Sequence, residues 1–153
     1  MRKILSKNFF ERDTLEVAEN LLGKYLIRKI GDKEIALRIN EVEAYAGFED
    51  KASHAHKGKT ERNKVMFGEA GNWYVYLVYG MHNMLNIVTG EKDYPAAILI
   101  RGAGDIVGPG KLTKFLKIDR KLNGKNSSVK TGLWFEDSGE ATDKTKIKRV
   151  SRI

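Results

Sequence analysis

Two carboxylates and a tyrosine continue an apolar alternation between positions 35 and 45. The residues at every second position are Ile35, Leu37, Ile39, Glu41, Glu43 and Tyr45. Residues two apart lie on one face of a strand, so this spacing predicts an apolar face that turns acidic. Carboxylates at the end of a buried face are desolvated and repel each other, which leaves at least one available as a general base. The alternative is that both glutamates emerge into solvent where the strand leaves the sheet, and spacing alone favours that alternative.

A second stretch, from Trp73 to Tyr79, is aromatic and β-branched, which is typical of a strand. Its alternation puts Trp73, Val75, Leu77 and Tyr79 on one face and Tyr74, Tyr76 and Val78 on the other. Each buried hydroxyl needs a partner, so the tyrosines cannot all lie in a dry core. Aromatic rings among basic residues can instead stack on nucleobases, at about 1–3 kcal/mol per base. Tyr79 precedes a glycine turn and can project as a wedge, although an ordinary core strand is slightly favoured by this stretch alone.

The histidines offer a weak metal site. His54 and His56 form an H-x-H pair on a polar loop, His82 is expected at a hairpin tip, and the chain has no cysteine. No third ligand at zinc-like spacing completes the pair. We therefore expect no metal, and expect one loop histidine to stack or hydrogen-bond in its neutral form.

A glycine-rich turn at 108–110 precedes Lys111. Leu112 stands where a phosphate-binding loop would carry serine or threonine, so nucleotide hydrolysis is disfavoured. A Gly-Lys helix start can still hold a backbone phosphate of DNA.

The elements that must position these residues are mostly strands. Asp13 and Glu16 have the spacing of a helix N-cap and its reciprocal partner, and Gly23 supplies a stop. The predicted strands are 25–30 and 34–45, joined by a hairpin at 31–32, then 73–79, 83–89 after a tip at 80–82, 96–101, one near 132–135, and 146–153. A polar loop spans 47–64 and a short helix follows 108–110. We predict one α+β domain over residues 1–153, with a twisted antiparallel sheet, flanking helices and a protruding hairpin.

Composition limits the classes of protein. Of 153 residues, 41% are hydrophobic and 31% charged, which is typical of a soluble globular domain. No apolar run could span a bilayer and no cleavable leader is visible, so we expect a cytoplasmic protein. The formal charge of +8 favours a polyanionic partner, at about even odds for nucleic acid on charge alone.

Together these segments resemble the alkyladenine (3-methyladenine) DNA glycosylase family. The stretches that match in order are Phe9–Asp13 with Leu21–Gly23, Glu41–Tyr45, Ser53–His54 with Arg62–Asn63 and Met66–Phe67, Tyr74–Asn86, and Gly108–Pro109 with Lys111–Leu112. The combination of E-x-E-A-Y with Y-V-Y-x-x-Y-G-M is highly specific, and the resemblance covers most of the chain from Phe9 to about Asp119.

The resemblance implies a role for each matched residue. Glu43 matches the general base that activates the attacking water, and Arg101 matches an arginine beside that water. The residues that match the sandwich around the flipped-out base are Tyr45, His54 and Tyr76. Asn86 matches the side chain that obstructs guanine's 2-amino group, and Tyr79 matches the wedge in the minor groove. The further DNA contacts fall at Met81, Arg62 and Lys111.

The implied function is that of a monofunctional DNA-3-methyladenine glycosylase in base excision repair. It would act as a monomer on double-stranded DNA with no cofactor, and would leave an abasic site after releasing 3-methyladenine, hypoxanthine or ethenoadenine. We expect it in the cytoplasm, at the nucleoid in a prokaryote and in the nucleus of a eukaryote. A non-catalytic module that recognises damaged DNA is the main alternative, and would need Tyr79 but not Glu43. A metal-dependent phosphodiesterase that uses His54, His56 and the glutamates is the third.

Two features depart from the family pattern. The segment 102–107 is shorter than the family's and lacks the acidic-proline pair that follows the matched arginine. The chain ends at the strand that 148–153 resembles, whereas the family runs further. These departures bear on efficiency and substrate range more than on the reaction.

Overall fold

The computed structural model describes residues 2–48, 50, 52–53, 55–140 and 143–150. Its strands are β1 (Lys3–Ile4), β2 (Tyr25–Ile30), β3 (Lys33–Ala46), β4 (Trp73–Val78), β5 (His82–Val88), β6 (Ala96–Ala103), β7 (Ile106–Val107) and β8 (Leu133–Asp137). Its α-helices are α1 (Lys7–Phe10), α2 (Thr14–Leu21) and α3 (Pro109–Phe115). Its short 3₁₀ turns are η1 (Lys64–Phe67), η2 (Arg120–Leu122) and η3 (Lys144–Lys146).

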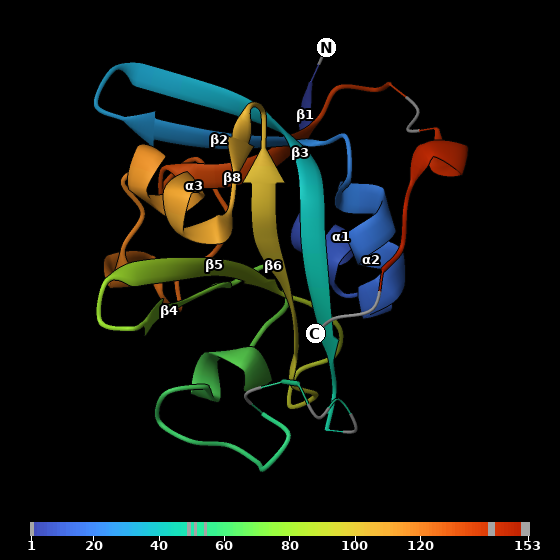
Figure 1. Cartoon of the computed structure of the whole chain (residues 1–153), viewed down its shortest axis with the longest axis vertical. Coiled ribbons are helices and arrows are strands. Elements are labelled where there is room, and N and C mark those ends of the chain that lie inside the picture. Colours follow the sequence, from blue (N-terminus) through green and yellow to red (C-terminus); the bar gives the residue numbers. More distant parts are fainter. Residues whose placement is uncertain (1, 49, 51, 54, 141–142, 151–153) are drawn as a thin grey trace.

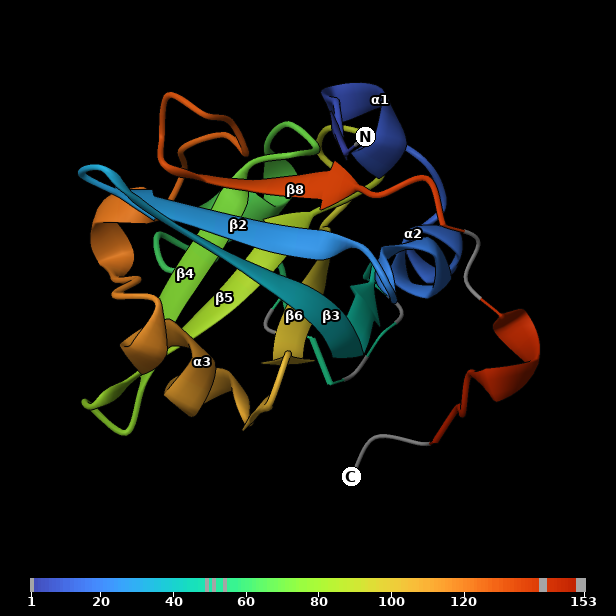
Figure 2. The same cartoon turned by 90° about the horizontal axis from the view of Figure 1, so that it is seen from above.

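The strands form one antiparallel sheet in the order β1-β8-β2-β3-β6-β5-β4, with β7 beside β6. The long strand β3 joins its two halves, because its first part pairs with β2 and its second part with β6. Seen from above, β2 and β8 cross over β4, β5 and β6 (Figure 2). The predicted α+β domain with an antiparallel sheet is confirmed.

The main core lies between the two halves of the sheet, and helices cover its sides (Figure 1). Its largest buried side chains include Phe10, Leu21, Trp73, Ile98 and Phe135. A second, smaller cluster lies on the opposite face of β4, β5 and β6, where Met66, Phe67, Tyr74 and Ala97 pack together. That face is the one available for a site, because the other is filled by the core.

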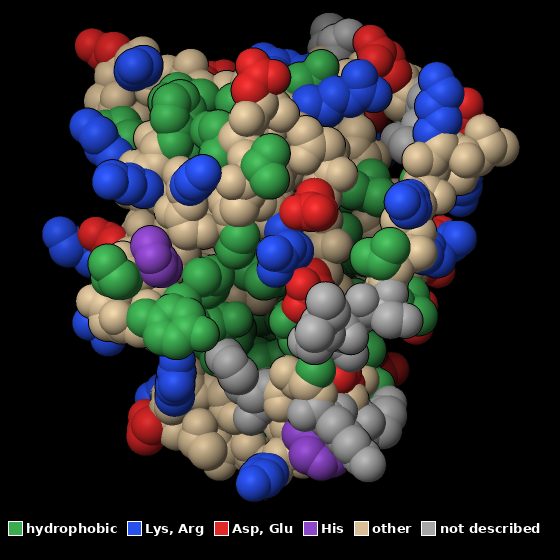
Figure 3. All heavy atoms as spheres, viewed as in Figure 1, with side chains coloured by type: hydrophobic (Ala, Val, Ile, Leu, Met, Phe, Trp, Pro, Cys, Tyr) green, Lys and Arg blue, Asp and Glu red, His purple; other side chains and the backbone are tan. Residues whose placement is uncertain are grey.

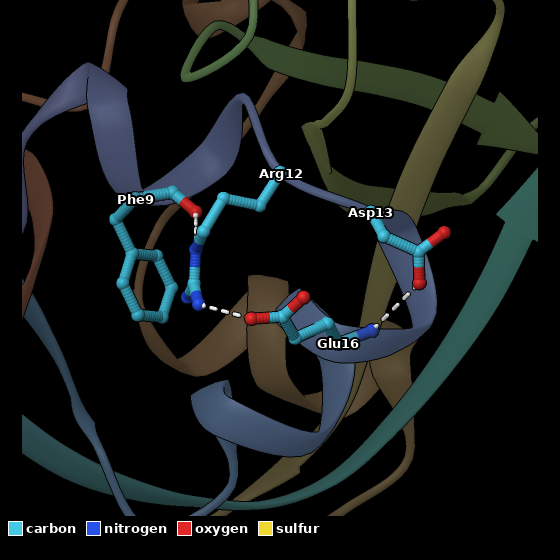
Figure 4. Close-up of polar contacts among 4 residues, drawn as sticks. All are labelled: Phe9, Arg12, Asp13 and Glu16. Atoms are coloured by element: carbon cyan, nitrogen blue, oxygen red, sulfur yellow. Dashed lines mark hydrogen bonds and ion pairs between the residues drawn. The ribbon is translucent and has the colours of Figure 1, made fainter.

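The helix start predicted at Asp13 is present, with one difference in its hydrogen bonds (Figure 4). The Asp13 carboxylate accepts a hydrogen bond from the Glu16 backbone N–H at 3.2 Å, as an N-cap does. The Glu16 carboxylate pairs with Arg12 at 2.7 Å. Arg12 also donates to the Phe9 carbonyl oxygen and lies over the Phe9 ring. This contact ties α1 to α2.

The prediction that one face of β3 carries both the apolar residues and the carboxylates is wrong. The register between β3 and β6 shifts twice between Ile39 and Val42, with Asn40 as an extra residue on β3 and Arg101 as an extra residue on β6, which marks a β-bulge in each strand. Before the bulge Leu37 packs against the main core, and after it Val42 packs there too, although the two are five positions apart. An extra residue in a bulge reverses the alternation, so Tyr45 packs against the second cluster instead. The bulge turns the acidic positions away from the core.

The last strand predicted at 146–153 is also wrong within the part that the structure describes. Residues 144–146 form a 3₁₀ turn and 147–150 have no regular structure. The outer edge of β8 is already paired with β1, so it offers no free edge. The segment is held instead by an ion pair between Arg149 and Glu19 on α2. None of the helices in the described ranges has the length and apolar character needed to cross a membrane.

Candidate active site

Glu43 is bound from two directions, by a group on its own strand and by one on a neighbouring strand. The Tyr45 hydroxyl, from the same strand, donates to Oε1 of Glu43. Arg101 on β6 donates from Nη1 to Oε2 at 3.2 Å, and its Nε lies 3.5 Å from Oε1 of Glu41. The Glu43 side chain is 20% exposed and that of Glu41 54% exposed, so Glu43 is the more sheltered carboxylate.

This cluster can serve both as a base and as a stabiliser of positive charge. Two carboxylates and one guanidinium leave a formal charge of −1. A carboxylate has about four lone-pair positions, so Glu43, with one protein donor at each oxygen, can still accept a proton. The bulge described above makes this arrangement possible by presenting Glu43 on the face opposite the core.

An open cavity of about 700 Å³ adjoins the cluster. Its walls come from β3, β4, β5, β6, the tip of the β4–β5 hairpin, the loop before η1 and the start of α3. The lining residues are Tyr45, Arg62, Tyr76, Leu77, Val78, Tyr79, Met84, Leu99, Arg101 and Pro109. The space-filling view shows hydrophobic side chains around a hollow on this face, with Lys and Arg side chains near its rim (Figure 3). Tyr45 and Arg101, the two partners of Glu43, are both in the wall.

A smaller cavity of about 30 Å³ adjoins the first, since Tyr45 and Tyr76 line both. Its other lining residues are Ala52, Ser53, Met66, Tyr74 and Asn86. Asn86 is 2% exposed and donates from Nδ2 to the Tyr74 carbonyl oxygen at 3.2 Å. The site therefore has an open outer part and a narrow inner part with an amide at its side.

Tyr76 keeps a neutral hydroxyl over a wide pH range. Burial raises its pKa, and the nearby negative charge of Glu43 raises it further. The positive charge of Arg62 opposes that rise, as does a hydrogen bond with Asn86. Arg62 lies 5.6 Å from the centre of the Tyr76 ring and donates to the Leu77 carbonyl oxygen at 2.9 Å. The Tyr76 ring is thus a neutral aromatic wall of the cavity, with the Arg62 guanidinium beside it.

Tyr79 projects from the tip of the β4–β5 hairpin and is 93% exposed. It has a φ of 52° and Gly80 a φ of 65°, and the Met81 N–H donates to the Val78 carbonyl oxygen. Positive φ at both central residues is the geometry of primed hairpin turns, which glycine, asparagine and aspartate adopt more easily than tyrosine. His82, predicted at the tip, is instead the first residue of β5.

Helix α3 supports the hairpin from the side of the core. The buried Thr113 donates from Oγ1 to the Asn83 carbonyl oxygen at 2.8 Å. A Cβ atom on Gly110 would lie only 3.0 Å from Nδ1 of His82, so the helix and the hairpin are in close contact. Pro109 reaches the cavity wall and Lys111 is exposed in the first turn.

The structure brings together most of the residues singled out in the sequence. Those at the cavities are Tyr45, Arg62, Tyr76, Tyr79, Asn86 and Arg101, with Glu43 bound to two of them. Met81 and Lys111 lie outside the cavity walls, and His54 lies outside the described residues. Sequence reasoning missed Met84 and Leu99, which two-residue alternation from Asn86 and Arg101 would have found.

Comparison with known proteins gives a consistent set of matches. Residues 8–107 match the family described as methylpurine-DNA glycosylase. A relative from Methanocella arvoryzae is 46% identical over 88% of this chain and 77% of its own. One from Legionella pneumophila (strain Paris) is 45% identical over 97% of this chain and 84% of its own, and one from Borreliella afzelii is 47% identical over 78% and 70%. Each carries the name "Putative 3-methyladenine DNA glycosylase".

Proposed function

Because the chain belongs to the methylpurine-DNA glycosylase family, we propose that it hydrolyses the N-glycosidic bond of modified purines in double-stranded DNA through a water activated by Glu43. Membership of this family supports a monofunctional DNA glycosylase of DNA repair, and we propose 3-methyladenine as its main substrate. Hypoxanthine and ethenoadenine are the further substrates that we propose.

The observation that carries this proposal is the position of Glu43. It is oriented by Tyr45 and Arg101 at the wall of a cavity that is also lined by Tyr76 and opens beside the exposed Tyr79. A base inside a duplex is out of reach of any carboxylate, and extruding it costs a few kcal/mol. In this mechanism Tyr79 fills the vacated stack and offsets part of that cost.

The extruded base stacks against the aromatic walls formed by Tyr45 and Tyr76. The family resemblance assigns His54, which lies outside the described residues, to the same sandwich. Flat walls accept many purines, and an alkylated base that carries positive charge is attracted to the ring faces. Asn86, buried at the inner cavity, would obstruct the 2-amino group of guanine. The pocket would therefore accept modified adenines and hypoxanthine and reject normal guanine.

The proposed hydrolysis uses water as its only co-substrate and needs no cofactor. The C1′–N bond breaks and its electron pair leaves with the base, so positive charge develops on the sugar. Cationic 3-methyladenine leaves as a neutral base, whereas a neutral purine takes up one proton from solvent as it leaves. Water adds to C1′ and gives a proton to Glu43, while the net negative charge of the cluster stabilises the sugar cation. Since the nucleophile is water and not a lysine amine, the DNA strand stays intact at the abasic site.

We propose that residues on the β4–β5 hairpin and beside the cavity bind the DNA. Met81 beside the wedge is 70% exposed, and Arg62 and Lys111 offer positive charge near the cavity for backbone phosphates. We further propose that the protein acts as a monomer on DNA in the cytoplasm, or at the nucleoid.

The test is release of free base from a duplex with one 3-methyladenine, beside a hypoxanthine duplex, in the presence of EDTA. We expect free 3-methyladenine and a strand that is cut only after alkali. Binding without base release would contradict the proposal and favour a module that recognises damage without catalysis. Loss of activity with EDTA would favour a metal-dependent enzyme instead.

A further inference from the structure

Most of the net charge of the chain is concentrated in one stretch. Residues 111–130, the basic segment, contain Lys111, Lys114, Lys117, Arg120, Lys121, Lys125 and Lys130 against the single acidic residue Asp119. This gives the segment a formal charge of +6, whereas the whole chain carries +8. The rest of the molecule is nearly neutral, so any attraction to a polyanion comes largely from this segment.

The seven basic side chains are exposed and uncompensated. Each is on the surface, and among the described residues none lies within ion-pair distance of a carboxylate. On α3, Leu112 and Thr113 are buried while Lys111 and Lys114 point outward at helical spacing. By contrast, Lys7 and Arg12 elsewhere on the surface are paired with glutamates.

The basic segment begins beside the candidate active site and contacts both strands of the β4–β5 hairpin. Pro109, just before it, is in the cavity wall, and Thr113 is bonded to the start of β5. Further along, Oδ1 of Asn123 accepts a hydrogen bond from the Val75 N–H, and the Lys125 carbonyl oxygen accepts one from the Trp73 N–H. The segment therefore contacts β5 beside the wedge and β4 at Val75 and Trp73. Its middle lies against β2, where Arg28 donates to the Leu116 and Lys117 carbonyl oxygens.

We propose that the basic segment binds the backbone of the DNA duplex that flanks the lesion, on one side of the Tyr79 wedge. This inference rests on the proposed function. The segment starts beside the cavity and the wedge, and its exposed positive charge suits a phosphate backbone. Phosphate contacts of this kind carry no sequence information. They supply affinity for undamaged DNA and hold the enzyme in register while the wedge samples bases.

The test compares wild type with the triple variant Lys114→Gln, Arg120→Gln and Lys121→Gln, none of which lines the cavity. Affinity for an undamaged 25-base-pair duplex is measured by fluorescence anisotropy at several salt concentrations. Each lost phosphate contact lowers the slope of log K against log salt by about 0.9, so we expect a decrease of up to about 2.7. Single-turnover base release at saturating enzyme should stay at the wild-type rate, because the cavity is unchanged.

A matched control removes the same charge elsewhere. Lys3, Lys146 and Lys148 are exposed, lie on β1 and the C-terminal segment away from α3 (Figure 1), and are changed to Gln together. The control should keep the wild-type salt slope. An unchanged slope in the test variant, or an equal decrease in the control, would overturn the proposal. Failure of the proposed function would appear separately, as absence of base release by the wild-type protein.

Discussion

Glu43 is held by two kinds of donor, and each fixes a different property of the carboxylate. The hydroxyl of Tyr45 sets its orientation from the same strand, whereas Arg101 supplies positive charge from the neighbouring strand. Arg101 also approaches Glu41, so one guanidinium links both carboxylates. The nearness of Glu41 to Arg101 could not be predicted from spacing, because it depends on how β3 and β6 pair.

Tyr79 has a backbone conformation that is unfavourable for its residue type. Left-handed φ costs a residue with a Cβ about 1–2 kcal/mol, and asparagine tolerates it better. We therefore expect Tyr79→Asn to keep or raise the melting temperature by a few degrees. Base release from an intact duplex should fall about tenfold or more, because nothing fills the vacated stack. Thermal melting and single-turnover kinetics measure the two effects.

A single-stranded substrate is the control for that prediction. No stack has to be filled there, so the variant and wild type should release the base at similar rates. A variant that is slower on both substrates by the same factor would show that Tyr79 acts on the pocket and not on the duplex.

The raised pKa of Tyr76 predicts a loss of stability in alkali. Burial raises this pKa above the ordinary value of 10, so the folded state holds the proton more tightly than the unfolded state. The stabilisation is fully present below pH 10 and is lost as pH rises through the folded pKa. We expect the melting temperature of wild type to fall more steeply above pH 10 than that of Tyr76→Phe. Parallel curves for the two proteins would contradict this account.

The bulge in β3 is the structural feature that turns the acidic residues toward the cavity. The Asn40 side chain stabilises it by donating to the Gly104 carbonyl oxygen at 2.9 Å, beyond the end of the paired strand. Gly102 lies opposite, where an added Cβ would be 2.8 Å from Oδ1 of Asn40 and 3.3 Å from the Ile106 carbonyl oxygen. The bulge therefore requires a residue without a side chain at position 102.

Gly102→Ala tests that condition. The clash should displace Asn40 and the bulge, and so weaken the contact between Glu43 and Arg101. We expect a melting temperature lower by several degrees and base release slowed by about tenfold or more in protein that is still folded. Circular dichroism at the assay temperature shows whether the variant is folded, and so separates loss of stability from loss of activity. Full activity in the folded variant would show that the carboxylates do not depend on the bulge.

Local patterns predicted the regular elements well and the bulge not at all. The N-cap at Asp13, the β2–β3 hairpin and the aromatic strand β4 are set by neighbouring residues, and the structure confirms them. The bulge depends on Gly102 and Gly104, about sixty residues away, so alternation within β3 could not reveal it. The prediction of a strand at 146–153 was wrong for a similar reason, because β1 already pairs with the edge of β8.

The site exists only when four strands, the tip of a hairpin, the loop between β3 and η1 and the start of α3 come together. Motif resemblance named its members, because E-x-E-A-Y and Y-V-Y-x-x-Y-G-M carry most of them. It did not give the two joined cavities, the contact between Arg62 and the Tyr76 ring, or the path of the basic segment. These features depend on contacts between residues that are far apart in the sequence. The whole molecule thus presents an exposed tyrosine at a hairpin tip, a cavity beside a sheltered carboxylate and a positively charged segment that starts next to that cavity.

Single-turnover release of base from a 3-methyladenine duplex by Glu43→Gln, with Glu41→Gln as the matched control, tests the proposed mechanism most directly. Both changes keep the size of the side chain and remove one carboxylate beside Arg101. Loss of a general base typically slows a reaction by about 10²–10⁴-fold, so we expect a decrease of that size for Glu43→Gln with duplex affinity retained. Glu41→Gln should slow release by less than about tenfold. Release by Glu43→Gln at the wild-type rate would contradict the assignment of Glu43 as the base.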